Sequence, residues 1–533
     1  MHPAFVSRSP WARPLAGAFA LVACATAHAA PDSLGAFGWA APAGSAQVAT
    51  GGQGADAAHT YTVRNRNELV LALYPDAQIA DDGSFTSVNG ADPTPKIIYV
   101  KAKIDLSTNK AGRKLGLADF KDPAFDFSAY VAAFQPSVWN ADPANWDAAR
   151  NRPKAPSGAQ EDARQRSASN QARITTLPIG SNTSLLGVGH DPRIVNGMTQ
   201  VIGVSNVVIR NIRFEDAFDH FPAWDPTDSF ALNTAVPGCQ ASFVDAAHGP
   251  QRCPGGRWNS NYDLVQVRDS TYVWVDHNDF NDGDREDWRF PSVFAAPHVG
   301  LDYHVQHHDG AVDVVNTSNF VTLSHNRFQN HDKTLLLGGS NTATPANGWG
   351  ALSITVAYNE FKNIGQRMPR VRFGKVHVFN NFLSGKIGYL GALAPTSTEV
   401  KVPHNRFLYG MGIGNLAKLY AENNVFDIQD APDAPGTGQA VDASVTFFAF
   451  HGADQTIDGV LETTYFYDAG SQLNGKPVDI AAAAAVASVA AGKPVPQSTP
   501  AVWSPSNDYS YRLVPTRDVK HFVKANAGAG ILK

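Results

Sequence analysis

A short sequence pattern recurs along the middle of this chain and constrains its fold more than any other feature. Each copy contains three or four alternating apolar residues, then Asn, one further residue and Phe. Clear copies lie at 207–214, 273–280, 321–328, 354–361 and 376–382, with weaker copies at 402–407 and 419–426. Short strands at a period of about 22 residues cannot bury their apolar faces alone, so they must stack on one another. The repeat therefore predicts an all-β fold, a right-handed single-stranded parallel β-helix (solenoid) with long loop insertions.

The asparagines of the pattern have a structural explanation. Asn tolerates the left-handed backbone conformation of a sharp bend, and its side-chain amide can bond to the Asn above and below it in a stack of coils. We therefore expect a ladder of buried asparagines rather than a catalytic group. The candidate ladder residues are Asn278, Asn326, Asn359, Asn380, Asn405 and Asn424.

The segments on either side of the repeats fit the same solenoid. Residues 61–63 and 97–101 are rich in β-branched and aromatic residues and read as entry strands, with a short capping helix at 67–73 between them. The stretch from about 112 to 172 is polar, Pro-rich and poorly patterned, so we interpret it as a surface excursion. The Ala/Pro/Gly-rich tail from about 464 is expected to pack along the outside or to cap the last coil.

The N-terminus carries an export signal. Basic residues precede an apolar stretch and a small-x-small site that ends at Ala29, which is typical of a secretory signal peptide over residues 1–29. Cleavage there leaves 30–533 as one β-helix domain, which we expect to be secreted. Cys24 also fits a lipoprotein cleavage site, so lipidation at Cys24 is an alternative.

Two cysteines remain after cleavage, Cys239 and Cys253, and both lie in a Pro/Gly/His-rich insertion at about 229–256. In an exported protein a disulfide between them is the expected pairing. A zinc site is less favoured, because neither a second cysteine pair nor a histidine at finger spacing accompanies them.

Composition limits the partners of the mature chain. The net charge of -5 and the pI of about 6.4 argue against a nucleic-acid binder that works through a general basic field. A polyanionic partner must instead meet a local basic patch. No stretch after the signal approaches the length of a membrane span, so we expect a soluble protein with no membrane contact unless it is lipidated. We also expect it to be a monomer.

Three aspartates form the first half of a candidate site. Asp263 precedes Asp309 by 46 residues, which is one coil plus the loop at 282–307, and Asp313 lies four residues further on, so the three would lie on one face of the solenoid. Such an acidic cluster repels itself unless a cation lies among its oxygens. Hard oxygen ligands without a thiol favour Ca²⁺ over zinc or copper.

A cationic group forms the second half. Lys333 lies about one coil beyond the last of these aspartates, and Arg367, Arg370 and Arg372 follow within six residues of one another. On a strand Arg370 and Arg372 share a face, and Arg367 joins them only if Pro369 breaks the pleat. The patch suits carboxylates that are recognised bidentately.

These motifs together resemble those of the pectate lyases of polysaccharide lyase family 1, in the same order and at similar spacing. The similarity extends from about Tyr61 to the C-terminal tail, with the two insertions as departures. The residues that carry it are Trp258 to Asp263, Val273 to His277, Asp309 to Asp313, His331 to Lys333 and Gln366 to Gly374.

The resemblance implies β-elimination on α-1,4-linked polygalacturonate with calcium as cofactor. The acidic cluster (Asp263, Asp309 and Asp313) would bind Ca²⁺, Arg367 would remove the proton at C5, and Lys333 and Arg372 would hold substrate carboxylates. Arg370 is a further candidate for substrate binding from its place in the patch. Because arginine is seldom neutral near pH 7, an arginine base predicts an alkaline activity optimum.

Other functions remain open on the sequence. A β-helical polygalacturonase would hydrolyse the same polymer, but the Gly-His-Gly and Arg-Ile-Lys motifs expected of that family are missing. A pectin lyase would act on the methyl-esterified polymer without calcium, yet here three candidate calcium acids are present. A non-catalytic β-helix that binds polysaccharide would use the same surface without making an unsaturated product.

Overall fold

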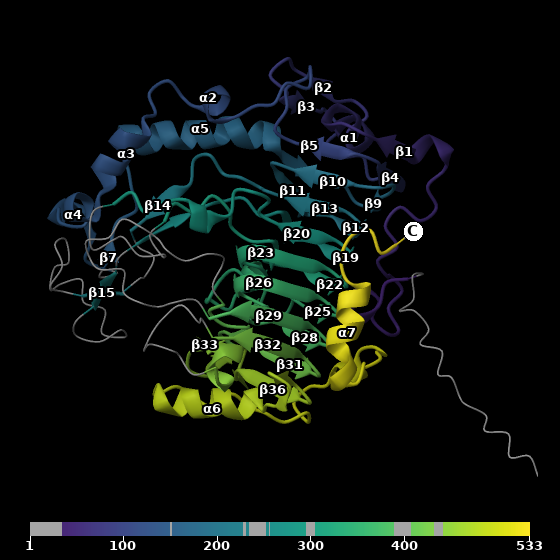
Figure 1. The fold of residues 1–533 in the computed structure, drawn as a ribbon, viewed down its shortest axis with the longest axis vertical. Coiled ribbons are helices and arrows are strands. Elements are labelled where there is room, and N and C mark those ends of the chain that lie inside the picture. The colour runs from purple at the N-terminus through teal and green to yellow at the C-terminus, as the bar shows by residue number, and fades with distance from the viewer. Residues whose placement is uncertain are drawn as a thin grey trace, which may run out of the picture. The chain divides into compact units, whose positions relative to one another are not determined.

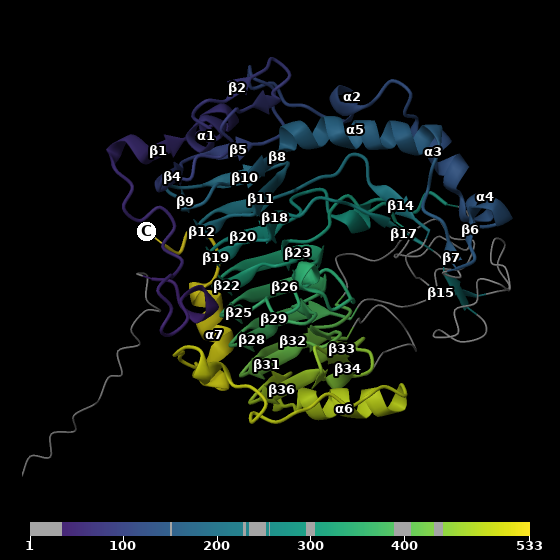
Figure 2. The same ribbon diagram turned by 180° about the vertical axis from the view of Figure 1, so that it is seen from behind.

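Three sheets of parallel strands surround one hydrophobic core in the computed structural model (Figures 1 and 2). The structure describes residues 35–149, 152–226, 231–233, 252–254, 256–294, 304–387, 407–430 and 441–532. Residues 1–29, and with them the predicted signal peptide and Cys24, lie outside this part of the chain. Each full coil supplies one strand to each sheet, so the chain visits the three sheets in turn.

The first sheet contains the apolar strands of the repeated pattern. Its ten strands are β1 (Thr60–Val63), β4 (Lys96–Val100), β9 (Thr183–Gly187), β12 (Ser205–Arg210), β19 (Thr271–Asp276), β22 (Asn319–Ser324), β25 (Ile354–Ala357), β28 (Lys375–Phe379), β31 (Lys418–Glu422) and β36 (Tyr465–Ala469). Equivalent residues of successive copies pair directly: Val207 with Val273, Val273 with Val321, Val321 with Ile354, and Ile354 with Val376. The predicted parallel β-helix is therefore confirmed.

The second sheet follows the first after a short bend. Its ten strands are β5 (Lys103–Asp105), β10 (Arg193–Val195), β13 (Arg213–Glu215), β20 (Asp279–Asn281), β23 (Arg327–Lys333), β26 (Glu360–Gln366), β29 (Phe382–Lys386), β32 (Val425–Gln429), β37 (Gln472–Leu473) and the antiparallel β38 (Lys476–Pro477). In the copies at 207–214, 273–280, 321–328 and 354–361 the Phe points into the core from this sheet, whereas in the copy at 376–382 Leu383 takes that place and Phe382 packs outside with Val519 and Val523. The rings of Phe214, Phe280, Phe328 and Phe361 stack in sequence at 5.3, 5.0 and 5.0 Å.

The third sheet carries the candidate site. Its eight parallel strands are β8 (Thr176–Pro178), β11 (Met198–Ile202), β18 (Val265–Arg268), β21 (Val312–Val315), β24 (Leu336–Leu337), β27 (Arg370–Val371), β30 (Met411–Ile413) and β33 (Phe447–Ala449). Long loops join the second sheet to the third, and these loops hold most of the residues that the repeated pattern leaves unexplained.

The bend between the first and second sheets contains the predicted asparagine ladder, with one shift in register. Each ladder amide donates to the next side-chain oxygen at 3.0 or 3.1 Å along Asn278, Asn326, Asn359, Asn381 and Asn424. The left-handed residue is the one before each ladder position, and it is Asn380 that has a φ of 52°. The assignment of Asn380 to the ladder was therefore wrong by one residue.

Of the weak copy at 402–407, only residue 407 lies in the described part of the chain. Strand β28 pairs directly with β31, so no further strand of the first sheet lies between them. Asn405 itself falls outside the described residues. In the described ladder Asn381 donates directly to Asn424.

The predicted surface excursion at about 112–172 is largely helical and has a core of its own. It contains α2 (Leu117–Phe120), α3 (Phe127–Phe134), α4 (Pro136–Trp139) and α5 (Ala159–Thr175). Tyr130 and Phe134 are buried against Trp224 and Trp258, which come from the loop before β18. The sequence of this segment looked unstructured because its apolar partners lie far away along the chain.

Helices also cover the two ends and one side of the solenoid. The predicted capping helix is α1 (Arg66–Leu73), and α6 (Ile480–Ala490) contacts β33 and β36 of the last coils. Helix α7 (Thr516–Asn526) packs outside β29 and β32, and beyond it Gly530 N donates to Asn211 Oδ1 at 2.6 Å (Figure 1). The tail therefore both caps the last coil and returns along the outside.

Short antiparallel pairs lie outside the three sheets. They are β2 (Gln78–Ile79) with β3 (Phe85–Thr86), β6 (Trp146–Asp147) with β7 (Arg152–Pro153), β14 (Ala223–Asp225) with β17 (Arg257–Asn259), β15 (Ala231–Asn233) with β16 (Arg252–Pro254), and β34 (Gln455–Ile457) with β35 (Val460–Glu462). Cys239 lies outside the described residues and only the backbone of Cys253 is described, so their pairing stays a prediction. Within the described ranges, no helix has the length and apolar character needed to cross a membrane.

Candidate active site

The acidic cluster assembles where two adjacent coils enter the third sheet. Asp263 precedes β18 by two residues, Asp313 lies in β21, and Asp309 lies in the loop just before β21. Because β18 and β21 pair in parallel, the three side chains come together, and each offers an oxygen within 4.8 Å of the other two. The stacking predicted from the coil spacing is what the structure shows for these three residues.

Gly310 makes this close approach possible. Its N–H donates to Asp263 Oδ1 at 2.8 Å, which fixes one carboxylate of the acidic cluster. A Cβ atom at this position would lie 2.2 Å from Asp313 Oδ1 and 2.8 Å from Asp263 Oδ1. Any side chain larger than hydrogen would therefore occupy the space between the two carboxylates. Nothing in the sequence distinguishes this glycine, although it lies inside the motif at 309–313.

The electrostatics of the acidic cluster call for a cation. Burial, together with the charges of Asp313 and Asp309, raises the pKa of Asp263 well above its usual range. Burial and the charge of Asp309 raise the pKa of Asp313 to about 7. Burial would also raise the pKa of Asp309, but the charges of Lys333 and Arg367 outweigh it and lower that pKa. Three oxygen ligands that repel one another in a buried site fit a hard divalent cation.

A second group of possible ligands surrounds Asp276, but protein donors already saturate it. Asp276, His277 and His325 offer atoms within 4.8 Å of one another. The carboxylate of Asp276 accepts from Arg210 Nε at 2.8 Å and from Ser324 Oγ at 2.6 Å, and it lies 2.6 Å from His277 Nδ1. These contacts lower the pKa of Asp276, against the effect of burial. Asp276 and the two histidines are thus held by contacts within the protein.

Lys333 lies directly beside the acidic cluster. It is the last residue of β23, and its Nζ donates to Asp309 Oδ1 at 3.0 Å. Its side chain is only 2% exposed, and burial lowers its pKa even though Asp309 opposes that effect. Gly310 and Lys333 also form a parallel bridge, so backbone pairing as well as charge holds the two segments together.

Arg367 lies between β26 and β27, outside both strands. Its φ of 64° is in the left-handed region, so the two-residue alternation of a strand does not govern the direction of its side chain. Its buried Nε has no hydrogen-bond partner in the described part of the chain. Burial would lower its pKa, but the charges of Asp309 and Asp313 outweigh that effect and raise it. The guanidinium is thus placed among the acids with a donor still available.

Arg370 and Arg372 project from the outer face of β27 and its continuation, as the strand alternation predicts. Arg372 Nε donates to Asn341 Oδ1 at 2.7 Å, and its Nη1 donates to the carbonyl of Gly338 at 2.9 Å. Burial and the charges of Arg370 and Arg367 lower the pKa of Arg372 to about 10. These contacts hold a cation that forms no ion pair with a carboxylate in the part of the chain that the structure describes.

Two buried histidines, His331 and His308, support the site, and the sequence did not reveal this role. His331 Nδ1 lies 2.6 Å from Asp282 Oδ1, and its Nε2 lies 2.8 Å from the carbonyl of Lys333. His308 lies between Asp287 at 2.8 Å and Asp216 at 3.1 Å. Both nitrogens of each ring face acceptors, and the nearby acids raise the pKa of both rings despite burial. The histidines next to Asp309 and Lys333 were the available signal, but their acidic partners come from distant loops.

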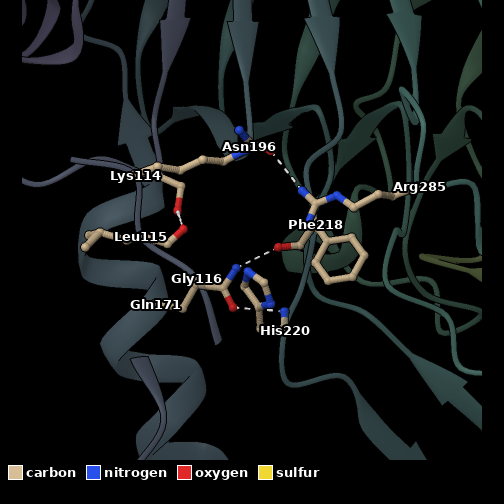
Figure 3. A pocket seen from close by; sticks show the side chains of 9 residues that line it. Lys114, Leu115, Gly116, Gln171, Asn196, Phe218, His220 and Arg285 are labelled. Carbon is tan, nitrogen blue, oxygen red and sulfur yellow. Dashed lines mark hydrogen bonds between the residues drawn. The ribbon is translucent and has the colours of Figure 1, made fainter. Parts of the chain in front are cut away.

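A separate cavity of about 340 Å³ lies between α5 and the loops that follow the second sheet (Figure 3). Lys114, Gln171, His220 and Arg285 are among its lining residues, and none of the described lining residues is acidic. Burial lowers the pKa of His220 to about 4, so its ring is neutral near pH 7. Arg285 donates to Asp216 at 2.8 Å, which connects the cavity wall to the histidine support. With no carboxylate, the cavity lacks the ligands that a hard cation requires.

The sequence of this chain is similar to those of known pectate lyases. A family model described as pectate lyase matches residues 250–532. The pectate lyase of Bacillus subtilis (strain 168) is 36% identical over 483 residues, which cover 91% of this chain and 90% of that protein. Pectate lyase E of Dickeya dadantii (strain 3937) is 27% identical and covers 82% of this chain and 75% of its own length.

Solved structures give the same result. The pectate lyase from Acidovorax avenae subsp citrulli matches with a TM-score of 0.76 and 37% identity, over 95% of this chain and 96% of that chain. A pectate lyase bound to a hexasaccharide matches with a TM-score of 0.67 and 35% identity, over 93% and 97%. The fold and the site define a β-helical polysaccharide lyase. Within that class, the chain belongs to the pectate lyases of polysaccharide lyase family 1.

Proposed function

We propose that this chain is a calcium-dependent lyase that cleaves α-1,4-linked polygalacturonate by β-elimination and leaves 4,5-unsaturated oligogalacturonides. The observation that carries the proposal is the buried acidic cluster, whose oxygens lie within 4.8 Å of one another next to Lys333 and Arg367. The relative that binds a hexasaccharide supports an oligosaccharide ligand for this fold.

Asp263, Asp309 and Asp313 would hold the calcium ion, and the space left by Gly310 fits that role. Bound calcium would supply positive charge next to a substrate carboxylate, which lowers the free-energy cost of charge that builds up during proton abstraction. Lys333 and Arg372 contribute the same kind of stabilisation from fixed positions. Because Lys333 is buried and Arg372 is held by two hydrogen bonds, little reorganisation is needed in the transition state.

Arg367 would accept the proton from C5 of the galacturonate ring. The C5–H bond and the C4–O bond break, a C4–C5 double bond forms, and the departing oxygen takes a proton from water. A guanidinium accepts this proton only when it is neutral, and the unscreened acids beside Arg367 favour its charged form. Cation binding at the acidic cluster would offset those negative charges and so make the neutral form more accessible. High pH would act in the same direction.

We also propose that the mature protein is an exported monomer that starts after Ala29 and contains a Cys239–Cys253 disulfide. The export signal and the pair of remaining cysteines support this. Intact mass measurement of the mature protein before and after reduction tests the cleavage site and the disulfide. Loss of residues 1–29 and a gain of two hydrogen atoms on reduction are expected. A lipid adduct on Cys24, or two free thiols before reduction, would contradict the proposal.

Product chemistry tests the reaction itself. Wild-type protein incubated with unesterified polygalacturonate should generate the ultraviolet absorbance of a conjugated double bond in step with new reducing ends. Arg367→Lys should lose at least about 100-fold in rate while it still binds polymer, because a proton acceptor is removed from its place. Reducing ends without absorbance would indicate a hydrolase. Polymer binding without either signal would indicate a non-catalytic binding protein, and activity confined to esterified polymer would indicate a pectin lyase.

A further inference from the structure

The outer face of the third sheet continues beyond the arginines into an aromatic surface. Register pairs Arg370 of β27 with Gly412 of β30, and Gly412 with Phe448 of β33. In the neighbouring row, Gly414 N donates to the carbonyl next to Arg372, and Phe450 N donates to Ile413 O. Each row therefore leads from an arginine, across a glycine, to a phenylalanine in the last coil.

Three rings make up this aromatic wall, which we define as Tyr409, Phe448 and Phe450. The centroids of Phe448 and Phe450 lie 5.7 Å apart with nearly parallel planes, and those of Tyr409 and Phe448 lie 5.1 Å apart. Phe448 is 44% exposed, and no other large apolar residue in the described strands of the third sheet is exposed to this degree. An exposed aromatic group next to binding residues needs an explanation beyond packing.

The aromatic wall is in direct contact with the arginines. The guanidinium of Arg370 lies 4.2 Å from the centre of the Phe450 ring, and that of Arg372 lies 5.1 Å from it. Gly414 permits this arrangement, because a Cβ atom there would lie 2.5 Å from the ring of Phe450. Phe450 thus holds both cations by cation–π contact, and Phe448 is left with its ring accessible.

We propose that the aromatic wall is a sugar-binding subsite for a galacturonosyl unit of the same polymer, several units away from the bond that is cut. The apolar C–H face of the sugar ring would pack on Phe448, while Arg370 or Arg372 would meet a carboxylate of that unit or its neighbour. Aromatic surface combined with a few charged donors is the usual make-up of a site for a polar ring ligand. This subsite rests on the proposed function, because it requires polygalacturonate as the polymer.

The surroundings favour this occupant over an apolar one. The wall is continuous along the sheet with the row that contains Asp313, Leu336 and Arg370, so a polymer bound at the acidic cluster and extending along the sheet reaches it. The two arginines give the surface positive charge, which complements an acidic sugar and opposes a purely apolar partner. A polymer that spans several coils of the third sheet would therefore place one of its sugar rings against the aromatic wall.

Kinetics on a length series of unesterified oligogalacturonates tests the subsite. Phe448→Ala should raise KM by about fivefold on the longest substrates, with a smaller effect as the substrate shortens and little change in kcat, because one ring contact is lost outside the reacting centre. Phe448→Trp should keep the wild-type dependence on length. Leu461→Ala removes an exposed apolar residue of β35 that lies outside these rows and serves as the matched control.

The outcomes separate this inference from the function on which it depends. If wild-type protein makes no unsaturated product from any length, the proposed function fails. If wild-type protein is active but Phe448→Ala changes KM equally at all lengths, or no more than Leu461→Ala does, the subsite is wrong. A change confined to methyl-esterified substrate would also overturn the subsite for an acidic sugar.

Discussion

Replacing Asp313 by Asn should stabilise the protein in the absence of calcium and destabilise it, relative to wild type, in the presence of calcium. The pKa of Asp313 is raised to about 7 by burial and by Asp309, against a usual value of 3.8. A raised pKa means that stability is fully present below the unfolded-state pKa and is lost as the pH rises through the folded-state pKa. For Asp313 that window runs from about pH 4 to about pH 7.

The size of the stability change follows from the same shift in the pKa of Asp313. A displacement of this size corresponds to about 4 kcal/mol of lost stability above pH 7 for a single buried carboxylate. Because the side chain is almost fully buried, little solvent screening reduces this value. Asn at this position keeps an oxygen that can accept from Leu336 N, as Asp313 does at 3.1 Å, but it carries no charge. The variant should therefore avoid most of the loss.

Thermal unfolding at pH 5 and pH 8, with a chelator and with calcium, measures the effect. In chelator at pH 8 Asp313→Asn should unfold at a higher temperature than wild type, and the two should converge at pH 5. Calcium should raise the unfolding temperature of wild type more than that of Asp313→Asn, so that in calcium wild type unfolds at the higher temperature. Asp276→Asn is the control, because its pKa is lowered by donors and its loss should destabilise the protein in every condition. Equal unfolding temperatures of Asp313→Asn and wild type in all four conditions would refute the reasoning.

Four further predictions follow from the structure. Gly310→Ala should weaken calcium binding at least about 10-fold by calorimetric titration, because its Cβ would meet two carboxylates, whereas Gly116→Ala, whose Cβ meets nothing within 4 Å, should bind as wild type. Lys333→Met should lower kcat by about 100-fold or more in steady-state assays with the fold intact by circular dichroism; a change in KM alone would contradict this. Asn359→Ala should cost about 1–3 kcal/mol in urea unfolding, because it leaves ladder partners unpaired, and no measurable loss would argue against the ladder as a stabilising feature. The rate should rise toward alkaline pH if Arg367 is the base, and a flat or acidic profile would count against it.

Much of the fold could be predicted because the repeated sequence pattern determines the strands and their stacking. A pattern of alternating apolar residues, Asn and Phe specifies which residues face the core, and stacking then follows from the period. The register failed at 380–382, because Phe382 follows Asn380 at the spacing of the pattern, whereas in the structure Leu383 takes the core place and Asn381 enters the ladder. The helices of the excursion could not be predicted because Tyr130 and Phe134 are buried by tryptophans from a loop far along the chain.

The candidate site was predictable to the extent that it depends on coil stacking. Spacing alone brought Asp263 and Asp313 into adjacent coils. Contacts between individual atoms were not predictable, such as the space at Gly310 or the pairing of His331 with Asp282. The side chain of Arg367 also escaped the strand alternation, because its backbone leaves the strand.

The most direct test of the account is the calcium dependence of unsaturated product formation. Wild-type protein should generate the ultraviolet absorbance of a 4,5-unsaturated uronate from unesterified polygalacturonate in calcium, lose it in chelator and regain it when calcium is restored. Asp313→Asn should require more calcium for the same rate, because one of three ligands loses its charge. Undiminished product formation by wild type in excess chelator would contradict the central claim.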